Sequence, residues 1–258
     1  MSANTAVILA AGMSVRLNAI VGTLPKGLIQ IGKTSLIGRS MNLLKKYGFE
    51  KIFVVSGHES EVLEKNLEPF SKKFKTEFVF NEHYAETGSM HSLFMLNERL
   101  QEDFLLLESD LLYEEDALIK LLQATQKDLI LISGQTNSGD EVWIYGDDPS
   151  DGNIGLVKGI SKNLIKDMKV KGELTGLSKI SNDLFMKMCS YHRNHLHFPS
   201  NYHYEECISD ICSEHPTLYL LISNLIWTEI DNPEHYETAV NKIWPKIKQK
   251  VLPNLNTN

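Results

Sequence analysis

Hydrophobic positions fall into two kinds of block through residue 125 of the chain. Short apolar runs bounded by polar residues or glycine indicate buried strands, and longer segments with apolar residues three or four positions apart indicate amphipathic helices. The predicted strands are 6–9, 51–56, 77–80 and 104–107, and the predicted helices are 36–47, 59–70, 89–100 and 114–123. This alternation predicts an α/β fold, with an open, mostly parallel, twisted sheet and helices on both faces.

After residue 125 the pattern changes to strand-like segments separated by polar turns. We expect added strands at 128–133, 141–145, 155–160 and 175–181, which cover a substrate site, then helices at 182–191 and 204–213 and strands at 218–222 and 227–230. A last helix starts at Pro233 and is capped by Asp231 or Asn232. The tail after Trp244 is expected to fray. We therefore predict one domain, 1–245, with halves 1–125 and 126–245, and a tail, 246–258.

Composition narrows the classes of function. The chain has 258 residues, of which 42% are hydrophobic and 23% charged, as in proteins that bury a sizeable core. A net charge of −7 argues against a nucleic-acid partner. No apolar run approaches the ~20 residues of a membrane span, and no basic segment suggests a secretory signal. Three cysteines cannot all pair, which favours a reducing, cytoplasmic location.

Small residues follow the first predicted strand, where Leu9-Ala10-Ala11-Gly12 lets the backbone approach a ligand closely. Arg16 and Lys26 add positive charge beside this turn. Exposed backbone amides together with two cations suit a nucleoside triphosphate. The alternative is a strand-to-helix turn that binds no nucleotide.

Asp110 follows the predicted strand 104–107. Ligands of open α/β sheets bind at the carboxyl ends of strands, so this carboxylate is a candidate ligand of Mg²⁺. The alternative is a helix or turn cap. Gly88 and Ser89, at the expected start of a helix, are candidates for hydrogen bonds to a base or ribose.

Several separated segments resemble one enzyme family. L-A-A-G-x-S-x-R-L at 9–17, followed by P-K at 25–26, resembles the signature of nucleotidyltransferases that join a nucleoside triphosphate to a phosphorylated small molecule. Segments 78–85, 89–93 and 110–113 resemble the cytidylyltransferases that activate phosphocholine or 2-aminoethylphosphonate. The resemblance covers residues 5 to 240 and implies a Rossmann-like nucleotidyltransferase fold, CTP as substrate and Mg²⁺ as cofactor.

The resemblance also implies residue roles. Segment 227–234 resembles the family's second metal segment, so Asp231 joins Asp110 as a metal ligand, and Glu229 lies two residues earlier on the same strand face. The alternative is that Asp231 only caps the last helix. The expected catalytic residues are Arg16, Lys26 and Asp110, and the expected nucleotide site comprises Leu9, Ala10, Ala11, Gly12, Arg16, Lys26, Asn81, Gly88 and Ser89.

The choice of acceptor depends on segment 136–143. The quaternary ammonium of choline is held by aromatic faces, whereas a primary ammonium donates hydrogen bonds to carboxylates. Glu141 stands where the phosphocholine enzymes have a tryptophan, which favours 2-aminoethylphosphonate. Trp143, with Tyr202, could still build a mixed aromatic and acidic cage. The candidate acceptor residues are Glu141, Trp143, Glu173, Lys179, Tyr204 and Glu205.

Glu173 is expected to meet the amine and Lys179 the phosphonate, although Lys179 could equally be a solvated surface residue. The predicted reaction joins CTP and 2-aminoethylphosphonate into CMP-2-aminoethylphosphonate and pyrophosphate. The alternatives are a phosphocholine cytidylyltransferase, more remotely a sugar-1-phosphate nucleotidyltransferase, and a nucleotide-binding regulator without turnover. The expected partners are CTP and a small phosphonate or phosphate ester, without nucleic acid or membrane, and a homodimer is left open.

Overall fold

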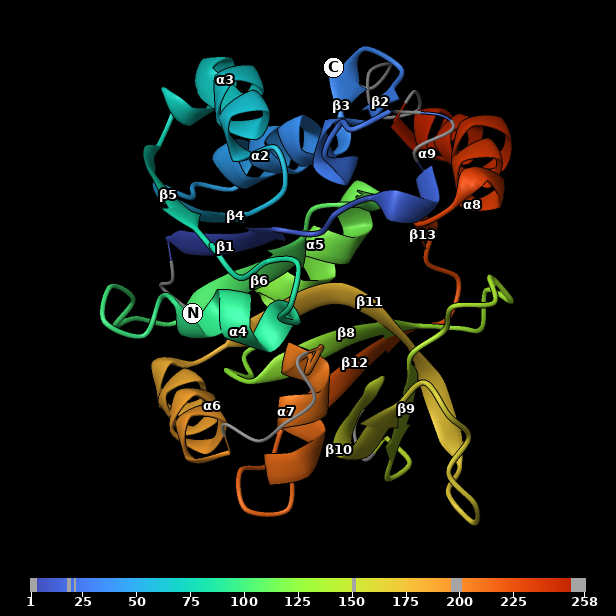
Figure 1. Ribbon diagram of the computed structural model, residues 1–258. Helices are drawn as coiled ribbons and strands as arrows, with labels where there is room; N and C mark the ends of the chain where they lie inside the picture. Colours follow the sequence, from blue (N-terminus) through green and yellow to red (C-terminus); the bar gives the residue numbers. More distant parts are fainter. Residues whose placement is uncertain (1–3, 18–19, 21, 150–151, 196–200, 252–258) are drawn as a thin grey trace.

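The computed structural model describes residues 4–17, 20, 22–149, 152–195 and 201–251. Four strands of the first half lie side by side in the order β5-β4-β1-β6, and all of them are parallel (Figure 1). They are β1 (Thr5–Ala10), β4 (Lys51–Ser56), β5 (Lys75–Phe80) and β6 (Phe104–Glu108). The parallel α/β arrangement predicted for this half is therefore present.

Alternate residues of β1 face different helices. Ala6 and Ile8 pack in one apolar cluster with α2 (Leu36–Lys46), α3 (Ser60–Ser71) and α5 (Glu115–Gln123). Val7 and Leu9 pack in another cluster with α4 (Ser89–Phe94), α6 (Asn182–Asn194) and α7 (Tyr204–Ile211). Both faces of the sheet are thus covered, as the apolar run of β1 predicts. Helix α4 ends at Phe94 and not at residue 100, because turns follow it.

The second half departs from the open, mostly parallel sheet that the sequence predicts. β11 (Val170–Ile180) pairs antiparallel with β6 and carries the order onward through β8 (Leu129–Ser133), β12 (Leu218–Ile222), β10 (Ile154–Ser161) and β9 (Trp143–Gly146). β9 then pairs back onto β11, so these strands close into a ring. The sheet is mixed, and the prediction of an open sheet is wrong here.

The length of β11 explains this closure. The strand has 11 residues, and its register shifts between Val170 and Gly172 and again between Leu174 and Ser178. Such irregularities bend a strand. Its first part therefore pairs with β9, and its last part pairs with β6. A pattern of apolar positions reports burial but does not report this change of neighbour.

A separate antiparallel pair joins β7 (Leu111–Tyr113) to β13 (Trp227–Glu229), and α8 (Pro233–Thr238) follows. Asn232 is the N-cap of α8, and its side chain accepts a hydrogen bond from the His235 backbone N–H at 2.9 Å. Of the two predicted caps, Asn232 is therefore the one that forms, and the Asp231 carboxylate is available for other contacts.

The chain continues through a π-helical turn, η3 (Ala239–Ile243), into α9 (Trp244–Val251). The predicted fraying is therefore wrong for residues 246–251, because Ile247 is buried in a small apolar cluster. The rest of the predicted tail lies outside the described residues. Within those residues, no helix is both long enough and apolar enough to cross a membrane. The cytoplasmic location and the homodimer stay predictions.

Candidate active site

A cavity of about 380 Å³ lies at the carboxyl ends of β1 and β6, between the two halves of the chain. Parallel strands bring their carboxyl ends to one edge, which is why residues far apart in sequence meet here. The predicted residues that line it are Leu9, Ala10, Ala11, Gly12, Arg16, Lys26, Gly88, Ser89, Asp110, Glu173, Glu205, Glu229 and Asp231.

The turn after β1 leaves open space for a ligand. A Cβ added at Gly12 would meet no protein atom within 4 Å. Ser14, which has a positive φ of 57°, accepts a hydrogen bond from the backbone N–H of Lys26 at 3.0 Å. This bond fixes the short helix η2 (Lys26–Leu28) against the turn. The two parts of the sequence signature are thus held together by the backbone.

Glycine at position 88 is required by a close approach of two segments. A Cβ there would lie 2.2 Å from the carbonyl oxygen of Tyr202, which leaves no room for any other residue. Residue 89 begins α4, and its hydroxyl accepts a hydrogen bond from the Tyr204 backbone N–H at 3.1 Å. The segment expected to meet the base is therefore packed directly against the start of α7.

Lys26 joins two carboxylates from opposite halves of the chain. Its ammonium lies 3.2 Å from Asp110 Oδ2 and also forms an ion pair with Asp231. Burial lowers the pKa of Lys26, but the charges of Asp110 and Asp231 outweigh burial and raise it. Lys26 therefore stays protonated at neutral pH, so it can stabilise negative charge but cannot accept a proton.

Arg16 shares Asp231 with Lys26 and contacts Asp140 as well. Its guanidinium lies 2.6 Å from Asp140 Oδ2 and 3.2 Å from Asp231 Oδ2, and its side chain is 55% exposed. An exposed ion pair contributes little to stability, so Arg16 can exchange these partners for phosphate oxygens at small cost.

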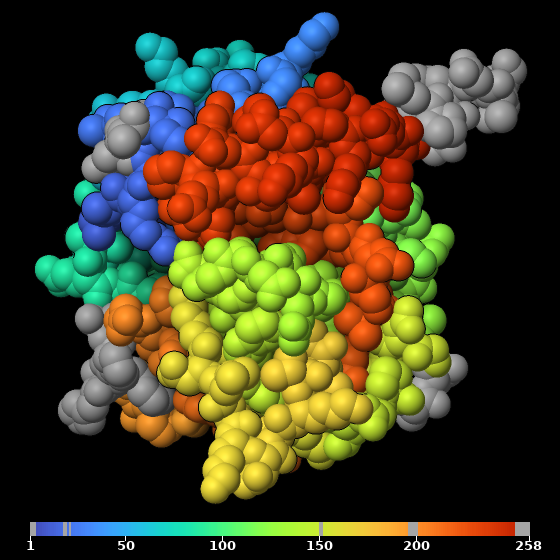
Figure 2. Space-filling model, turned by 90° about the vertical axis from the view of Figure 1, so that its right-hand side faces the viewer, coloured from blue at the N-terminus to red at the C-terminus, as the bar shows by residue number. Residues whose placement is uncertain are grey.

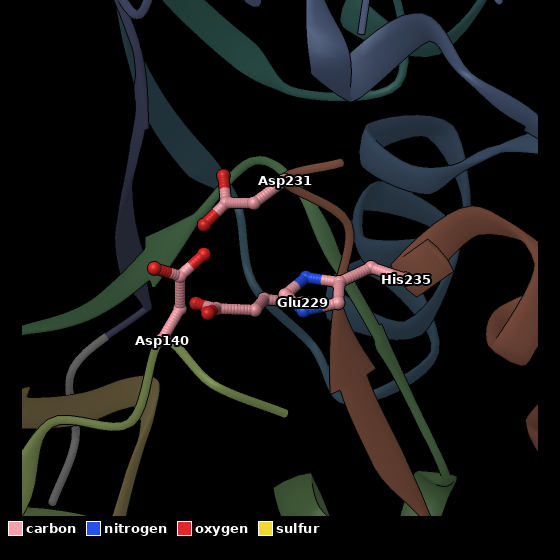
Figure 3. A group of neighbouring side chains, drawn as sticks. All are labelled: Asp140, Glu229, Asp231 and His235. Carbon is pink, nitrogen blue, oxygen red and sulfur yellow. The ribbon is translucent and has the colours of Figure 1, made fainter. Parts of the chain in front are cut away.

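Asp140, Glu229, Asp231 and His235 offer ligand atoms that all lie within 4.8 Å of one another, and the three carboxylates converge in Figure 3. Burial, followed by the charges of Asp231 and Asp110, raises the pKa of Glu229 to about 10. Lys26 and Arg16 lower the pKa of Asp231, but they do not offset burial and the neighbouring charges at Glu229. An additional cation with a preference for oxygen ligands fits such a cluster, as Mg²⁺ does, and imidazole is the less suitable ligand for it.

The acidic side chains of the second half differ in what holds them. Glu173 accepts hydrogen bonds from the backbone N–H and the hydroxyl of Thr136, at 2.8 and 2.9 Å, so it anchors the segment after β8. Figure 2 shows this yellow-green segment directly beneath the C-terminal helices, where His235 Nε2 lies 3.1 Å from the Ser138 carbonyl oxygen. Glu205 is buried at the cavity wall beside His203 and Lys162.

Several predicted residues do not line the cavity. Lys179 is buried at the far end of β11, opposite Leu105, and donates to the Ala124 carbonyl oxygen at 2.6 Å. It is therefore neither at the acceptor site nor on the solvated surface. Asn81 is also buried and donates to the hydroxyls of Thr87 and Ser92, both at 3.1 Å, so it shapes the loop and does not line the cavity.

Three predicted acceptor residues also lie outside the lining: Glu141, Trp143 and Tyr204. Trp143 starts β9 and pairs with Glu173 in the ladder. Tyr204 is fully buried and donates its hydroxyl proton to Glu108 at 2.8 Å. An aromatic cage around the cavity is thus not formed by the predicted residues.

Sequence reasoning missed Asp140, Glu108, Lys162 and His203, which all line the cavity. Asp140 precedes Glu141 in a turn where Asn137 and Gly139 have positive φ, and the direction of such a turn is not visible in the sequence. Glu108 could have been found, because it lies two positions before Asp110 at the end of a buried strand. Burial, followed by the charge of Asp110, raises the pKa of Glu108 to about 8.

Comparisons with known proteins place the chain among nucleotidyltransferases. A choline-phosphate cytidylyltransferase of Streptococcus pneumoniae is 26% identical over 55% of this chain and 59% of its own length. A CMP-5'-(3-aminopropyl)phosphonate synthase of Streptomyces rubellomurinus is 22% identical over 97% of this chain and 41% of its own length. The chain spans about half the length of the curated relatives it matches.

The solved structure of an inositol-1-phosphate CTP transferase from T. maritima shares the fold, with a TM-score of 0.78 and 19% identity over 96% of this chain and 98% of that one. The family model described as the MobA-like NTP transferase domain matches residues 6–186. The resemblance to nucleotidyltransferases is confirmed, and the chain belongs to the family of MobA-like NTP transferase domains.

Proposed function

We propose that this protein is a Mg²⁺-dependent cytidylyltransferase that joins CTP and 2-aminoethylphosphonate to give CMP-2-aminoethylphosphonate and pyrophosphate. The observation that carries the proposal is the contact of Lys26 with both Asp110 and Asp231 beside the open turn at Gly12. Relatives named as cytidylyltransferases for choline phosphate and for phosphoglutamine support cytidylyl transfer. A relative named as an aminopropylphosphonate CMP synthase supports a phosphonate acceptor.

The reaction requires alignment and charge neutralisation. An oxygen of the acceptor's phosphonate is anionic at neutral pH, so it attacks the α-phosphorus of CTP without a general base. The new P–O bond forms as the bond to pyrophosphate breaks, and pyrophosphate leaves with its electron pair. Lys26 is protonated and suited to the oxygens of the α-phosphate, where charge accumulates. Arg16 is suited to the β- and γ-phosphates.

Asp231 would hold the metal together with Glu229 or Asp140, which lie in one cluster with it, and Asp110, which shares Lys26 with Asp231, would be the further ligand. When bound, Mg²⁺ supplies neutralisation and orientation of the triphosphate. The carboxylates that now contact Lys26 and Arg16 would share that metal, which frees both cationic side chains for phosphate oxygens.

The acidic wall of the second half supports an acceptor with a primary ammonium. Glu205 is buried at the cavity, and Asp140 lies at its edge. Carboxylates can accept the hydrogen bonds of a primary ammonium, whereas a quaternary ammonium offers none and needs aromatic faces. Trp143 and Tyr204 lie outside the lining, which makes phosphocholine the weaker candidate.

The test crosses the four nucleoside triphosphates with 2-aminoethylphosphonate, phosphocholine and glucose 1-phosphate, with and without Mg²⁺. Pyrophosphate release gives the rate, and mass spectrometry identifies the product. We expect the highest kcat/KM with CTP and 2-aminoethylphosphonate, and none without a divalent cation. A preference for phosphocholine would overturn the acceptor. A preference for glucose 1-phosphate with another nucleotide would overturn cytidylyl transfer itself.

A further inference from the structure

A second cavity, of about 610 Å³, lies away from the active site. It is bounded by the hairpin of β2 (Gln30–Ile31) and β3 (Thr34–Ser35), by α2 and by α9, which gather at the top of Figure 1. None of the described residues that line the active-site cavity also lines this one. A molecule bound in this second cavity would therefore not occupy the active-site cavity.

The side chains around this second cavity are strongly basic. Lys33, Arg39, Lys46 and Lys248 line it, and no aspartate or glutamate belongs to its described lining. Glu115 on α5 is ion-paired to Lys46. Four cations at one cavity stand out in a chain with a net charge of −7. This local charge would attract an anion.

Arg39 is the cation that most needs a partner. Its terminal NH2 donates to the Tyr113 carbonyl oxygen at 3.2 Å, and its Nε is buried without a hydrogen-bond partner among the described residues. Burial lowers the pKa of this guanidinium. The charge of Glu115, which forms its ion pair with Lys46, opposes this effect. The buried Nε of Arg39 still lacks a hydrogen-bond acceptor within the described part of the chain, and phosphate oxygens fit the planar fork of this partly buried guanidinium.

Trp244 gives the cavity a flat apolar wall. The Arg39 guanidinium lies 5.1 Å and the Lys248 ammonium 5.8 Å from its ring centroid. Gly32 has a φ of +72°, and a Cβ there would lie 2.8 Å from the indole, so the hairpin can hold the ring only with glycine. Leu43 adds apolar surface. The indole and the cations thus lie side by side in the wall of this cavity.

We propose that this cavity is a second binding site, for a nucleoside phosphate, that is distinct from the active site. The phosphate would contact Arg39, Lys33 and Lys248, and the base would lie along Trp244 and Leu43. The size of the cavity and its mixture of cations with an aromatic wall both suit this class of ligand.

The site connects physically to the metal carboxylates. Arg39 holds the carbonyl of Tyr113 at the end of β7, and Leu111 of β7 pairs with Glu229 of β13. The backbone N–H of Ile230 also donates to the Asp110 carbonyl oxygen at 3.1 Å. An anion that draws Arg39 toward itself weakens its hold on β7. We therefore expect the bound ligand to lower turnover.

Calorimetric titration with CMP tests the site. We expect two CMP molecules per native chain, and one in the double variant Lys33→Ala/Lys248→Ala, whose affinity at the second site falls about ten-fold or more. Lys45→Ala/Lys65→Ala is the matched control, because both lysines are exposed and neither lines the cavity. Cytidine lacks the phosphate and inorganic phosphate lacks the base, so each should bind this site more weakly than CMP.

Kinetics provide the second measurement. At saturating CTP, CMP should lower kcat for the native protein and for the lysine control, but not for Lys33→Ala/Lys248→Ala. One CMP per native chain, or two in the double variant, would overturn the site. Two-site binding without any effect on kcat would overturn the coupling to β7. The double variant should keep its basal turnover, so a failure here is distinguishable from a failure of the proposed reaction.

Discussion

Up to residue 125, two groups of cavity residues lie at the carboxyl ends of parallel strands: Leu9 to Gly12 at the end of β1, and Glu108 to Asp110 at the end of β6. Beyond residue 125 the cavity residues come from unlike places: a turn before β9, the bent strand β11, helix α7 and strand β13. The first set is fixed by the geometry of parallel strands. The second set depends on connections, so we expect it to determine which acceptor is used.

The largest effect should come from the metal carboxylates, one from each half. Removing one preorganised charged group from a reaction centre costs about 10²- to 10³-fold in kcat, and loss of a metal ligand should cost at least this much. The kcat of Asp110→Asn and the kcat of Asp231→Asn should therefore fall by similar factors in the pyrophosphate-release assay. The control is Asp116→Asn, an exposed carboxylate on α5. Near-native turnover in either site variant would show that only one half supplies the metal site.

Lys26→Ala tests the residue that joins the two halves. Its contact is expected to strengthen in the transition state, so kcat should fall about 10²-fold and KM for CTP should change less. Lys120→Ala, an exposed lysine on α5, serves as the control. If only KM rose, Lys26 would bind nucleotide without stabilising the transition state.

Glu205→Gln separates acceptor recognition from nucleotide binding. A charge-assisted hydrogen bond contributes about 1.5–3 kcal/mol, so kcat/KM for 2-aminoethylphosphonate should fall about 10- to 150-fold. The KM for CTP should stay unchanged. Glu206→Gln is a matched neighbour, because Glu206 is exposed and accepts from the His203 backbone N–H, as an amide also can.

Glu141→Ala is a second control in that experiment and should have little effect, since Glu141 lies outside the cavity lining. A large loss in Glu141→Ala with none in Glu205→Gln would restore the acceptor assignment that the sequence first suggested.

The smallest effect is a dependence of stability on pH. The folded state raises the pKa of Glu108 from its ordinary 4.5 to about 8, through burial first and the charge of Asp110 second. The contribution of this group to the free energy of unfolding is fully present below about pH 4.5 and is lost as the pH rises through about 8. The Tm without metal should therefore fall across this interval by calorimetry. Mg²⁺ should reduce the fall because a cation favours ionised carboxylates.

Glu108→Gln should flatten the metal-free profile, because an amide has no proton to release. The Tyr204 hydroxyl, which now donates to Glu108, can donate equally to the amide oxygen. An unchanged slope in this variant would assign the pH dependence to other carboxyl groups.

The sequence predicts most of what local pattern controls. The strands β1, β4 and β6 and the turn at Gly12 follow from apolar runs that end in small residues. That Asp110 and the turn at Gly12 lie at the same edge of the sheet follows from the parallel arrangement. The features that the sequence does not predict depend on how distant segments pair and on how turns are directed. The return of β9 onto β11 closes the ring, and a turn of positive-φ residues directs Asp140 to the cavity in place of Glu141.

Lys26 and Asp231 are separated by 205 positions in the chain, and that separation governs when activity can appear during synthesis. The strands β1 and β4 can pair while most of the polypeptide is still being translated, since domains begin to fold from the N-terminus. A nascent chain that lacks residue 231 would carry the turn at Gly12 but only one of the two carboxylates that contact Lys26. Premature termination anywhere before β13 should therefore yield a product that lacks the Asp231 contact, and we expect no turnover from it.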